Sequence, residues 1–168
     1  IETNKEAKRA VLRLDAATSE VSLAYMTGDF ETAIRKAEEI LSRDGLQPQF
    51  RNFLQSYLIR SIVLSQTELS REELDAMIGE LTITDPTLAE KTQKMSVALY
   101  DLTIAHESND YFETLTNDYK YPQLEIIYYK ALNAAIKGDT NRAHELLSQL
   151  DGEDERLYVV RMGKELYK

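Results

Sequence analysis

The stretch Ala24-Tyr-Met-Thr-Gly28-Asp29-Phe-Glu-Thr-Ala33 has a counterpart in Ala134-Ala-Ile-Lys-Gly138-Asp139-Thr-Asn-Arg-Ala143. Each copy lies between two runs of apolar residues with helical spacing. Glycine readily adopts the left-handed conformation that ends a helix, and aspartate caps the next helix through its side-chain oxygen. The small alanines on either side allow two helices to approach closely. Both stretches therefore predict a tight hairpin of two antiparallel helices.

Apolar periodicity extends this pattern along the chain and predicts an all-α fold. We expect about nine helices, joined by short links into antiparallel hairpins. The hairpins resemble tetratricopeptide (TPR) repeats, but the two turn copies do not fit one constant period. We therefore expect an irregular TPR-like array, forming one domain over residues 1–168 of a longer chain. The expected helices span residues 4–27, 29–42, 48–65, 70–79, 85–106, 122–137, 139–150 and a final segment that carries Leu157, Val160, Met162 and Leu166.

Four local expectations follow from the same pattern. Asn109 stands where a third copy of the turn would place its glycine, and asparagine tolerates the left-handed conformation. Tyr128 and Tyr129 are adjacent on one helix, so we expect that they do not both point inward. Residues 81–84 alternate like a strand, but no partner strand is visible and a linker is expected. The first helix should carry an apolar stripe at near-helical spacing, formed by Ala7, Val11, Leu14, Ala17, Val21, Leu23 and Ala24.

The composition excludes several classes of function. The chain has 168 residues, 43% of them apolar, which is enough for a real core. It has no cysteine, so disulfides and thiolate metal sites are excluded. A net charge of -9 argues against nucleic-acid binding through this domain. No apolar run reaches the ~20 residues of a membrane span, although an anchor upstream of Ile1 is compatible with the sequence.

Negative charge is concentrated in the middle of the chain. Residues 64–119 contain 12 acidic residues, and their only basic residues are Arg71, Lys91 and Lys94. This stretch is either a solvated acidic face or a docking surface for a basic partner. Tyrosines cluster in the same region and beyond it, where they form either a core edge or an aromatic contact patch. The candidate partner-binding residues are Glu72, Asp75, Tyr100, Tyr111, Glu113, Tyr119 and Tyr121.

No pattern in the sequence predicts catalysis. His106 and His144 are the only histidines, and neither belongs to a metal-binding motif. The adjacent carboxylates Glu38-Glu39 and Glu72-Glu73 do not face each other on a helix. A glycine-rich phosphate loop and a nucleophile elbow are both missing. We therefore predict no catalytic residue, no metal site and no cofactor.

The order of several segments resembles the extracellular C-terminal region of EssB/YukC membrane proteins of the type VII secretion system of Gram-positive bacteria. The resemblance runs over residues 18–132. It implies a membrane-anchored, extracytoplasmic structural component that is dimeric and performs no catalysis. The segments that carry it are Glu68-Leu69-Ser70-Arg-Glu-Glu73, Leu81-Thr-Ile-Thr-Asp85, Tyr100-Asp-Leu-Thr-Ile-Ala105 and Pro122-Gln-Leu124-Glu-Ile-Ile-Tyr128-Tyr129.

A second resemblance leads to a different function. The segment from Ile78-Gly-Glu-Leu81 to Tyr100 is similar to helical-repeat peptide receptors of Firmicutes and their phages, including quorum-sensing and arbitrium regulators. That similarity implies a cytosolic domain whose stacked hairpins hold a short peptide. The expected function is a non-catalytic module that binds a protein or peptide partner. The secretion component is the first expectation, and the peptide receptor is the alternative.

Overall fold

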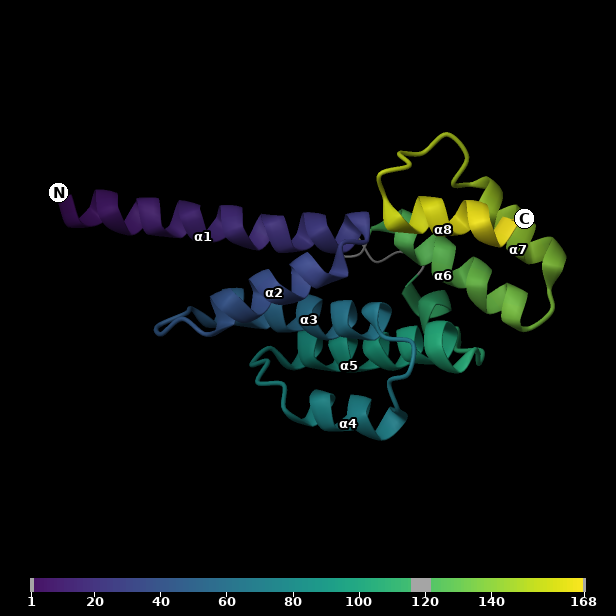
Figure 1. The fold of residues 1–168 in the computed structure, drawn as a ribbon, viewed down its shortest axis with the longest axis horizontal. Coiled ribbons are helices and arrows are strands. Elements are labelled where there is room, and N and C mark those ends of the chain that lie inside the picture. Colours follow the sequence, from purple (N-terminus) through teal and green to yellow (C-terminus); the bar gives the residue numbers. More distant parts are fainter. Residues whose placement is uncertain (1, 116–121, 168) are drawn as a thin grey trace.

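The computed structural model describes residues 2–115 and 122–167, and in this part of the chain it contains only helices and connecting segments (Figure 1). The all-α prediction is therefore confirmed. Eight elements are α-helices, η1 is a π-helical turn and η2 is a 3-10 helix. Their bounds are α1 Glu2–Thr27, α2 Phe30–Leu41, α3 Pro48–Ser65, α4 Arg71–Gly79, α5 Pro86–Tyr100, η1 Asp101–Ala105, η2 Asp110–Leu115, α6 Gln123–Ile136, α7 Thr140–Ser148 and α8 Tyr158–Tyr167.

The two predicted turns have nearly the same geometry. Gly28 has φ +85° and Gly138 has φ +83°, so both lie in the left-handed region. The amide of Asp29 donates to the carbonyl of Ala24 at 2.8 Å, and the amide of Asp139 donates to that of Ala134 at 2.9 Å. Each aspartate then accepts a hydrogen bond from an amide in the first turn of the following helix. The prediction of two equivalent helical turns is confirmed.

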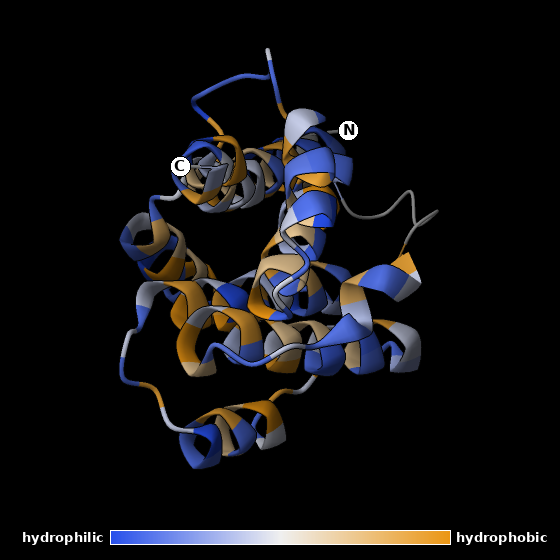
Figure 2. Ribbon diagram, turned by 90° about the vertical axis from the view of Figure 1, so that its right-hand side faces the viewer, coloured by the Kyte–Doolittle hydropathy of each residue, from blue (hydrophilic) through white to orange (hydrophobic). Residues whose placement is uncertain are grey.

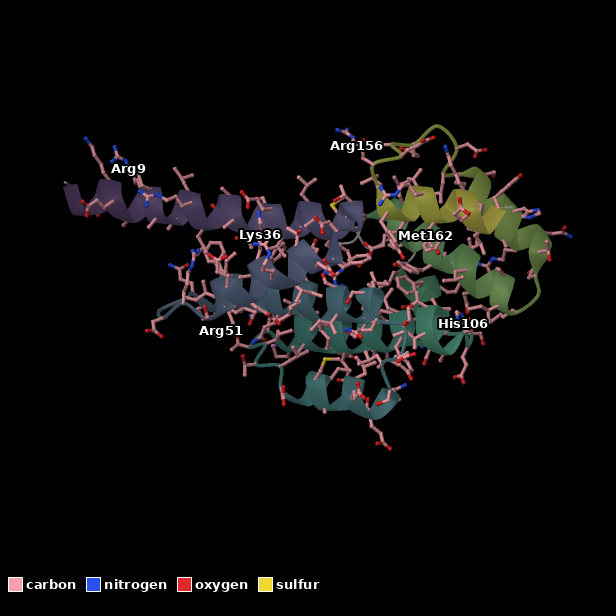
Figure 3. The ribbon with its side chains drawn as sticks, in the orientation of Figure 1. Arg9, Lys36, Arg51, His106, Arg156 and Met162 are labelled. Atoms are coloured by element: carbon pink, nitrogen blue, oxygen red, sulfur yellow. The ribbon has the colours of Figure 1, made fainter. Side chains whose placement is uncertain are left out.

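Small residues lie where these hairpins close. Ala24 and Ala33 are buried between α1 and α2, and Ala134 and Ala143 are buried between α6 and α7. A methyl side chain leaves room for the backbone of the facing helix, which brings the two helices into close contact. Figure 3 shows Lys36 on α2 directed toward α1, where it pairs with Glu20. The first hairpin is thus held by packing near its turn and by an ion pair further along.

The third turn differs from the prediction made for Asn109. The left-handed residue is His106, with φ +54°, which follows the π-helical turn η1 at the end of α5. The left-handed residue thus lies three positions before Asn109, where a copy of the glycine turn would place it. Asn109 acts as a cap instead, and its side-chain oxygen accepts the amide hydrogen of Tyr111 at 2.9 Å. Figure 3 labels His106 at this end of the molecule.

Two hydrophobic clusters form the interior. The first joins α1, α2 and α3 through residues such as Val21, Phe30 and Leu54. The second cluster is larger and includes residues from all the elements between α3 and α8. Leu64, near the end of α3, packs against both clusters. In Figure 2 the hydrophobic turns of the helices face one another, while the loop between α7 and α8 is hydrophilic. The fully buried residues of the second cluster include Leu74, Met95, Leu99, Leu102, Phe112, Ile126 and Tyr129.

The expectation that Tyr128 and Tyr129 do not both point inward is wrong. Their exposed fractions are 5% and 1%. The reason is that α6 is surrounded: α7, α8, η1 and η2 all pack against it. Tyr129 stacks on Phe112, with ring centroids 4.8 Å apart, while Tyr128 lies close to Gly163 of α8. A helix covered on several sides can bury adjacent side chains, which an amphipathic surface helix cannot do.

The first helix buries its stripe over only half of its length. All residues from Asn4 to Arg13 are exposed, and Leu23 is 63% exposed although it lies beside the core. Ala7, Val11 and Leu23 therefore belong to the apolar stripe of the sequence but not to the buried face of the helix. At a rise of ~1.5 Å per residue, α1 is about 39 Å long and α2 about 18 Å, so α1 extends far beyond its hairpin partner. Figure 1 shows this projection, and Figure 3 shows Arg9 on it, away from the body of the molecule.

Residues 81–84 form a linker, as predicted, and α3 holds this linker through two side-chain amides. Asn52 bonds both the amide and the hydroxyl of Thr84, at 3.1 and 3.0 Å. Gln55 bonds the same two groups of Thr82, at 3.0 and 2.7 Å. The two amide side chains form hydrogen bonds with alternate residues of the extended segment, as the edge of a neighbouring β-strand would. The short helix α4 is thereby fixed beside α3 and α5.

Candidate functional site

A buried hydrogen bond connects the first helix to the sixth. The hydroxyl of Tyr25, near the end of α1, donates to a carboxylate oxygen of Glu125, in the first turn of α6, at 2.5 Å. Both side chains are buried, and Glu125 is 6% exposed. Burial raises the pKa of the Tyr25 hydroxyl well above 10, and the nearby negative charge of Glu125 raises it further. A carboxylate in the first turn of a helix also interacts favourably with the helix dipole.

A buried arginine lies behind this pair. The guanidinium carbon of Arg60, on α3, is 4.4 Å from the ring centroid of Tyr57 and 4.9 Å from that of Tyr25. The Nε of Arg60 donates to the backbone carbonyl of Ser56 at 3.1 Å. Such stacking on two aromatic rings stabilises a cation away from water. Arg60, Tyr25 and Glu125 therefore form a continuous polar contact between α3, α1 and α6.

A cavity of about 100 Å³ lies next to this contact, at the junction of α1, α3, α6 and the start of α8. We call it the junction cavity. Its polar groups come from Glu125 and from three tyrosines, Tyr25, Tyr129 and Tyr158. The rest of the wall is mainly apolar. Its other lining residues are Met26, Leu64, Pro122, Gln123, Leu124, Leu157 and Val159.

The hydroxyl of Tyr129 is the unusual group of the junction cavity. It is buried, and within the described part of the chain it has no hydrogen-bond partner. Burial raises the pKa of this hydroxyl well above 10. A buried hydroxyl that makes no hydrogen bond costs about 1–3 kcal/mol, and such groups are rare in folded proteins. The position is therefore suited to a bound molecule that supplies the missing partner.

Helix α8 closes the junction cavity against the first turn. The guanidinium of Arg161 donates to the carbonyl of Thr27 at 2.6 Å. Tyr158 packs edge-on against Phe30, with ring centroids 5.0 Å apart. A side chain at Gly28 would collide with this arrangement, because its Cβ would lie 2.9 Å from a ring carbon of Tyr158. Gly28 is thus needed both for its backbone conformation and for this contact.

A second feature is an open groove between α1 and the first half of α3, which we call the α1–α3 groove. Leu23 on α1 is 63% exposed and Phe53 on α3 is 37% exposed, although both are large and apolar. Phe53 also lines a neighbouring depression between α3 and α5. The rim of the groove is polar. The residues of the α1–α3 groove are Asp15, Thr18, Ser19, Ser22, Leu23, Met26, Gln49, Phe50 and Phe53.

The described candidate residues chosen from the sequence lie on α4, on η2 and at the end of α5. Glu72 and Asp75 are exposed on α4, where Asp75 pairs with Arg71 at 3.0 Å. Glu113 is on η2 and pairs with Arg142 of α7 at 2.7 Å.

The tyrosines of that set differ from the acidic residues in their surroundings. Tyr100 and Tyr111 are half-buried and pack against the larger core cluster. This agrees with the core-edge interpretation of these two rings. Tyr119 and Tyr121 lie outside the described residues.

The sequence analysis did not identify the junction cavity, although one signal was present. Arg60 interrupts the apolar run Leu58–Leu64, and Glu125 lies within another apolar stretch at the start of α6. Charged residues are almost never buried unless they are paired, so a charge inside an apolar run marks a position where a partner is needed. The identity of each partner could not be read from the pattern, because the hydrogen bond joins residues that are 100 positions apart.

Within residues 2–115 and 122–167, no group of three or more His, Cys, Asp or Glu side chains is placed to hold a metal ion. His144 lies against the ring of Tyr167, with ring centroids 4.9 Å apart. In the same part of the chain, no helix has both the length and the apolar character needed to cross a membrane.

Comparison with known proteins adds no relative. No protein-family model, no curated protein and no solved structure matches this chain.

Proposed function

We propose that the chain is a non-catalytic protein–protein interaction module, and that the α1–α3 groove is its binding surface. The observation that carries the proposal is the exposure of Leu23 and Phe53 on the two helices that form the groove. Large apolar side chains beside a concave surface favour association, because binding removes them from water. A rim of hydroxyl and amide groups surrounds this apolar centre, as in many protein interfaces.

The chemistry of the groove favours an apolar segment of a protein partner with a basic residue next to it. Leu23 and Phe53 would contact the apolar side chains of that segment. Asp15 lies at the outer end of the groove and would attract the basic residue of the partner. Ser19 and Gln49 can form hydrogen bonds with the backbone of the partner segment. An amphipathic helix and an extended peptide both satisfy this description.

The resemblance of residues 18–132 supports a place for this module in a type VII secretion machine. There it would be the extracytoplasmic part of a membrane-anchored, homodimeric component. The alternative is a cytosolic peptide receptor, which the groove and its apolar centre also support. The coding sequence upstream of Ile1 separates the two: a membrane span favours the secretion component, and a DNA-binding helix-turn-helix favours the receptor.

The test of the groove is a selection followed by matched substitutions. A random peptide library is selected on the purified domain, and the dissociation constants of enriched peptides are measured by calorimetry. We expect Leu23→Ser and Phe53→Ser each to weaken binding by roughly ten-fold, about 1.4 kcal/mol. Leu12→Ser is the control, because Leu12 is 66% exposed on the same helix but lies outside the groove. An equal loss in Leu12→Ser, or no enriched peptide, would contradict the proposal.

A further inference from the structure

The junction cavity has a composition that points to one class of ligand. Its single carboxylate, Glu125, accepts a hydrogen bond from Tyr25. Within the described residues, no basic side chain forms an ion pair with Glu125. A carboxylate has two oxygens and about four acceptor positions, so most of its hydrogen-bonding capacity remains for a donor in the cavity. The guanidinium of Arg60 lies 4.9 Å from the Tyr25 ring centroid and offsets part of this negative charge, while direct ion pairing with the carboxylate remains open to a cation in the cavity.

The aromatic walls favour the same ligand. Tyr25, Tyr129 and Tyr158 all line the cavity together with Glu125. The face of an aromatic ring carries partial negative charge and attracts ammonium groups, and cages of this kind bind alkylammonium ligands. The buried hydroxyl of Tyr129, which lacks a partner in the described structure, can accept a hydrogen bond from an N–H group.

The remaining walls set the size and polarity of the ligand body. Leu64, Leu124 and Leu157 present aliphatic surface to the cavity. The cavity volume of about 100 Å³ is below the ~300–1,000 Å³ that is typical of small-molecule sites, so it suits a small ligand, part of which can extend into the space at its open mouth. A charged group alone would leave most of this surface without contacts. The ligand therefore needs an apolar body attached to its polar group.

We propose that the junction cavity binds an organic amine, whose ammonium group contacts Glu125 and the tyrosine hydroxyls while its apolar body fills the leucine-lined wall. This site shares the wall residue Met26 with the α1–α3 groove, but it does not depend on the function proposed for that groove. The same chemistry is offered by a free small-molecule amine and by the N-terminal residue of a peptide with an apolar first side chain.

The test compares three probes of similar shape on the whole domain. 2-Phenylethylammonium carries the positive charge, 2-phenylethanol is neutral and 3-phenylpropionate is negative. We expect the ammonium probe to bind with a dissociation constant near ~1 mM, as is usual for a fragment, at least about ten-fold more tightly than the alcohol. The propionate should not bind. Amide chemical shifts of residues around Leu124 and Leu157 report the location.

Substitutions in the cavity connect this selectivity to Glu125. Glu125→Gln keeps the size of the side chain and removes its charge, so the preference for the ammonium probe over the alcohol should disappear. Glu145→Gln is the matched control, because Glu145 is an exposed carboxylate on α7. If Glu125→Gln does not fold, Tyr129→Phe provides the second variant and should weaken ammonium binding several-fold while the fold is kept.

The two sources of the amine are distinguished by a short peptide that begins with phenylalanine. If this peptide binds and N-acetylation abolishes its binding, the site is assigned to peptide N-termini. If only the free amine binds, the site is assigned to small molecules. The proposal is overturned if ammonium and alcohol bind equally, if Glu125→Gln leaves the preference intact, or if no probe shifts the cavity amides at about ten times the ~1 mM expected for a fragment.

Discussion

The hydroxyl of Tyr25 donates a hydrogen bond to the carboxylate of Glu125 at 2.5 Å, in the interior of the molecule, across 100 positions of sequence. This bond ties the first helical hairpin to α6, the helix that the second half of the molecule surrounds. It also forms part of the wall of the junction cavity. Changes at these two residues should therefore affect both the stability of the fold and the properties of the cavity.

Tyr25→Phe should lower the free energy of unfolding by about 1.5–3 kcal/mol, the usual worth of a hydrogen bond to a charged group. The substitution keeps the ring and leaves the buried carboxylate of Glu125 without its donor. Urea denaturation of the single variants and of Tyr25→Phe/Glu125→Gln gives the coupling between the two residues. A loss below about 0.5 kcal/mol, or additive single effects, would show that the bond adds little to stability.

The buried tyrosines should make the protein sensitive to alkaline pH. Burial raises the pKa of both Tyr25 and Tyr129 well above 10 in the folded state. An unfolded tyrosine titrates near pH ~10, so above that pH the unfolded chain binds fewer protons than the folded one. The stability that these groups contribute is present below pH ~10 and falls above it, by about 1.4 kcal/mol per pH unit for each group.

Tyr129→Phe tests this alkaline effect, because the hydroxyl that it removes has no partner within the described structure. At neutral pH we expect the variant to be more stable than the parent, by up to about 1–3 kcal/mol, because the substitution removes a buried hydroxyl without a hydrogen-bond partner. Between about pH 10 and 11, the variant should lose about 1 kcal/mol less than the parent, because the unfolded tyrosine is already half ionised at pH ~10. Denaturant unfolding at a series of pH values measures the difference. Identical alkaline profiles for the two proteins would contradict the raised pKa of Tyr129.

The two turn glycines should respond differently to the same substitution. Gly28→Ala and Gly138→Ala both place a side chain at positive φ, which costs about 1–2 kcal/mol. At Gly28 the new Cβ would also lie 2.9 Å from Tyr158 and 3.0 Å from Arg161, whereas at Gly138 no atom lies within 4 Å. We expect Gly28→Ala to cost about 1–3 kcal/mol more than Gly138→Ala, by overpacking. Thermal unfolding of both variants measures this difference. Equal unfolding midpoints for the two variants would contradict the tight contact of α8 with the first turn.

Alanine positions on exposed and buried helix faces form another matched pair. Ala143→Leu inserts three carbons where α6 and α7 are in contact, and should destabilise by about 1–3 kcal/mol. Ala7→Leu makes the same change on the projecting half of α1, where the residue is exposed, and should be nearly neutral. Calorimetric unfolding of both variants measures the contrast. Tolerance of leucine at position 143 would mean that the second hairpin is looser than its buried alanines indicate.

Charge reversal on α4 tests the acidic surface as a docking site. Glu72→Lys together with Asp75→Lys should slow association with a basic protein partner and weaken the salt dependence of the rate, while helicity stays unchanged. Asp75→Lys also removes the exposed pair with Arg71, worth at most about 1 kcal/mol. Stopped-flow or surface-binding kinetics at several salt concentrations provide the measurement. An unchanged association rate at low salt would show that these carboxylates are only part of a solvated surface.

Local features of the fold could be predicted from the sequence because the interactions that produce them span only a few residues. The left-handed glycines at positions 28 and 138 and the aspartates that follow them depend on contacts within one turn of helix. The cap at Ser70, which accepts the amide hydrogen of Glu73 at 3.1 Å, has the same origin. Helical periodicity similarly predicted the all-α class, since it is a property of each segment alone.

The features that required the tertiary structure depend on how long each helix is and what surrounds it. The apolar stripe of α1 continues to Ala7, but α2 is too short to cover it, so periodicity alone does not show which part of the stripe is buried. Tyr128 and Tyr129 are both buried because several helices enclose α6. The contact of Tyr25 with Glu125, and with it the junction cavity, arises only when two hairpins far apart in the sequence pack together. No local pattern encodes such a contact, because each partner by itself is compatible with many neighbours.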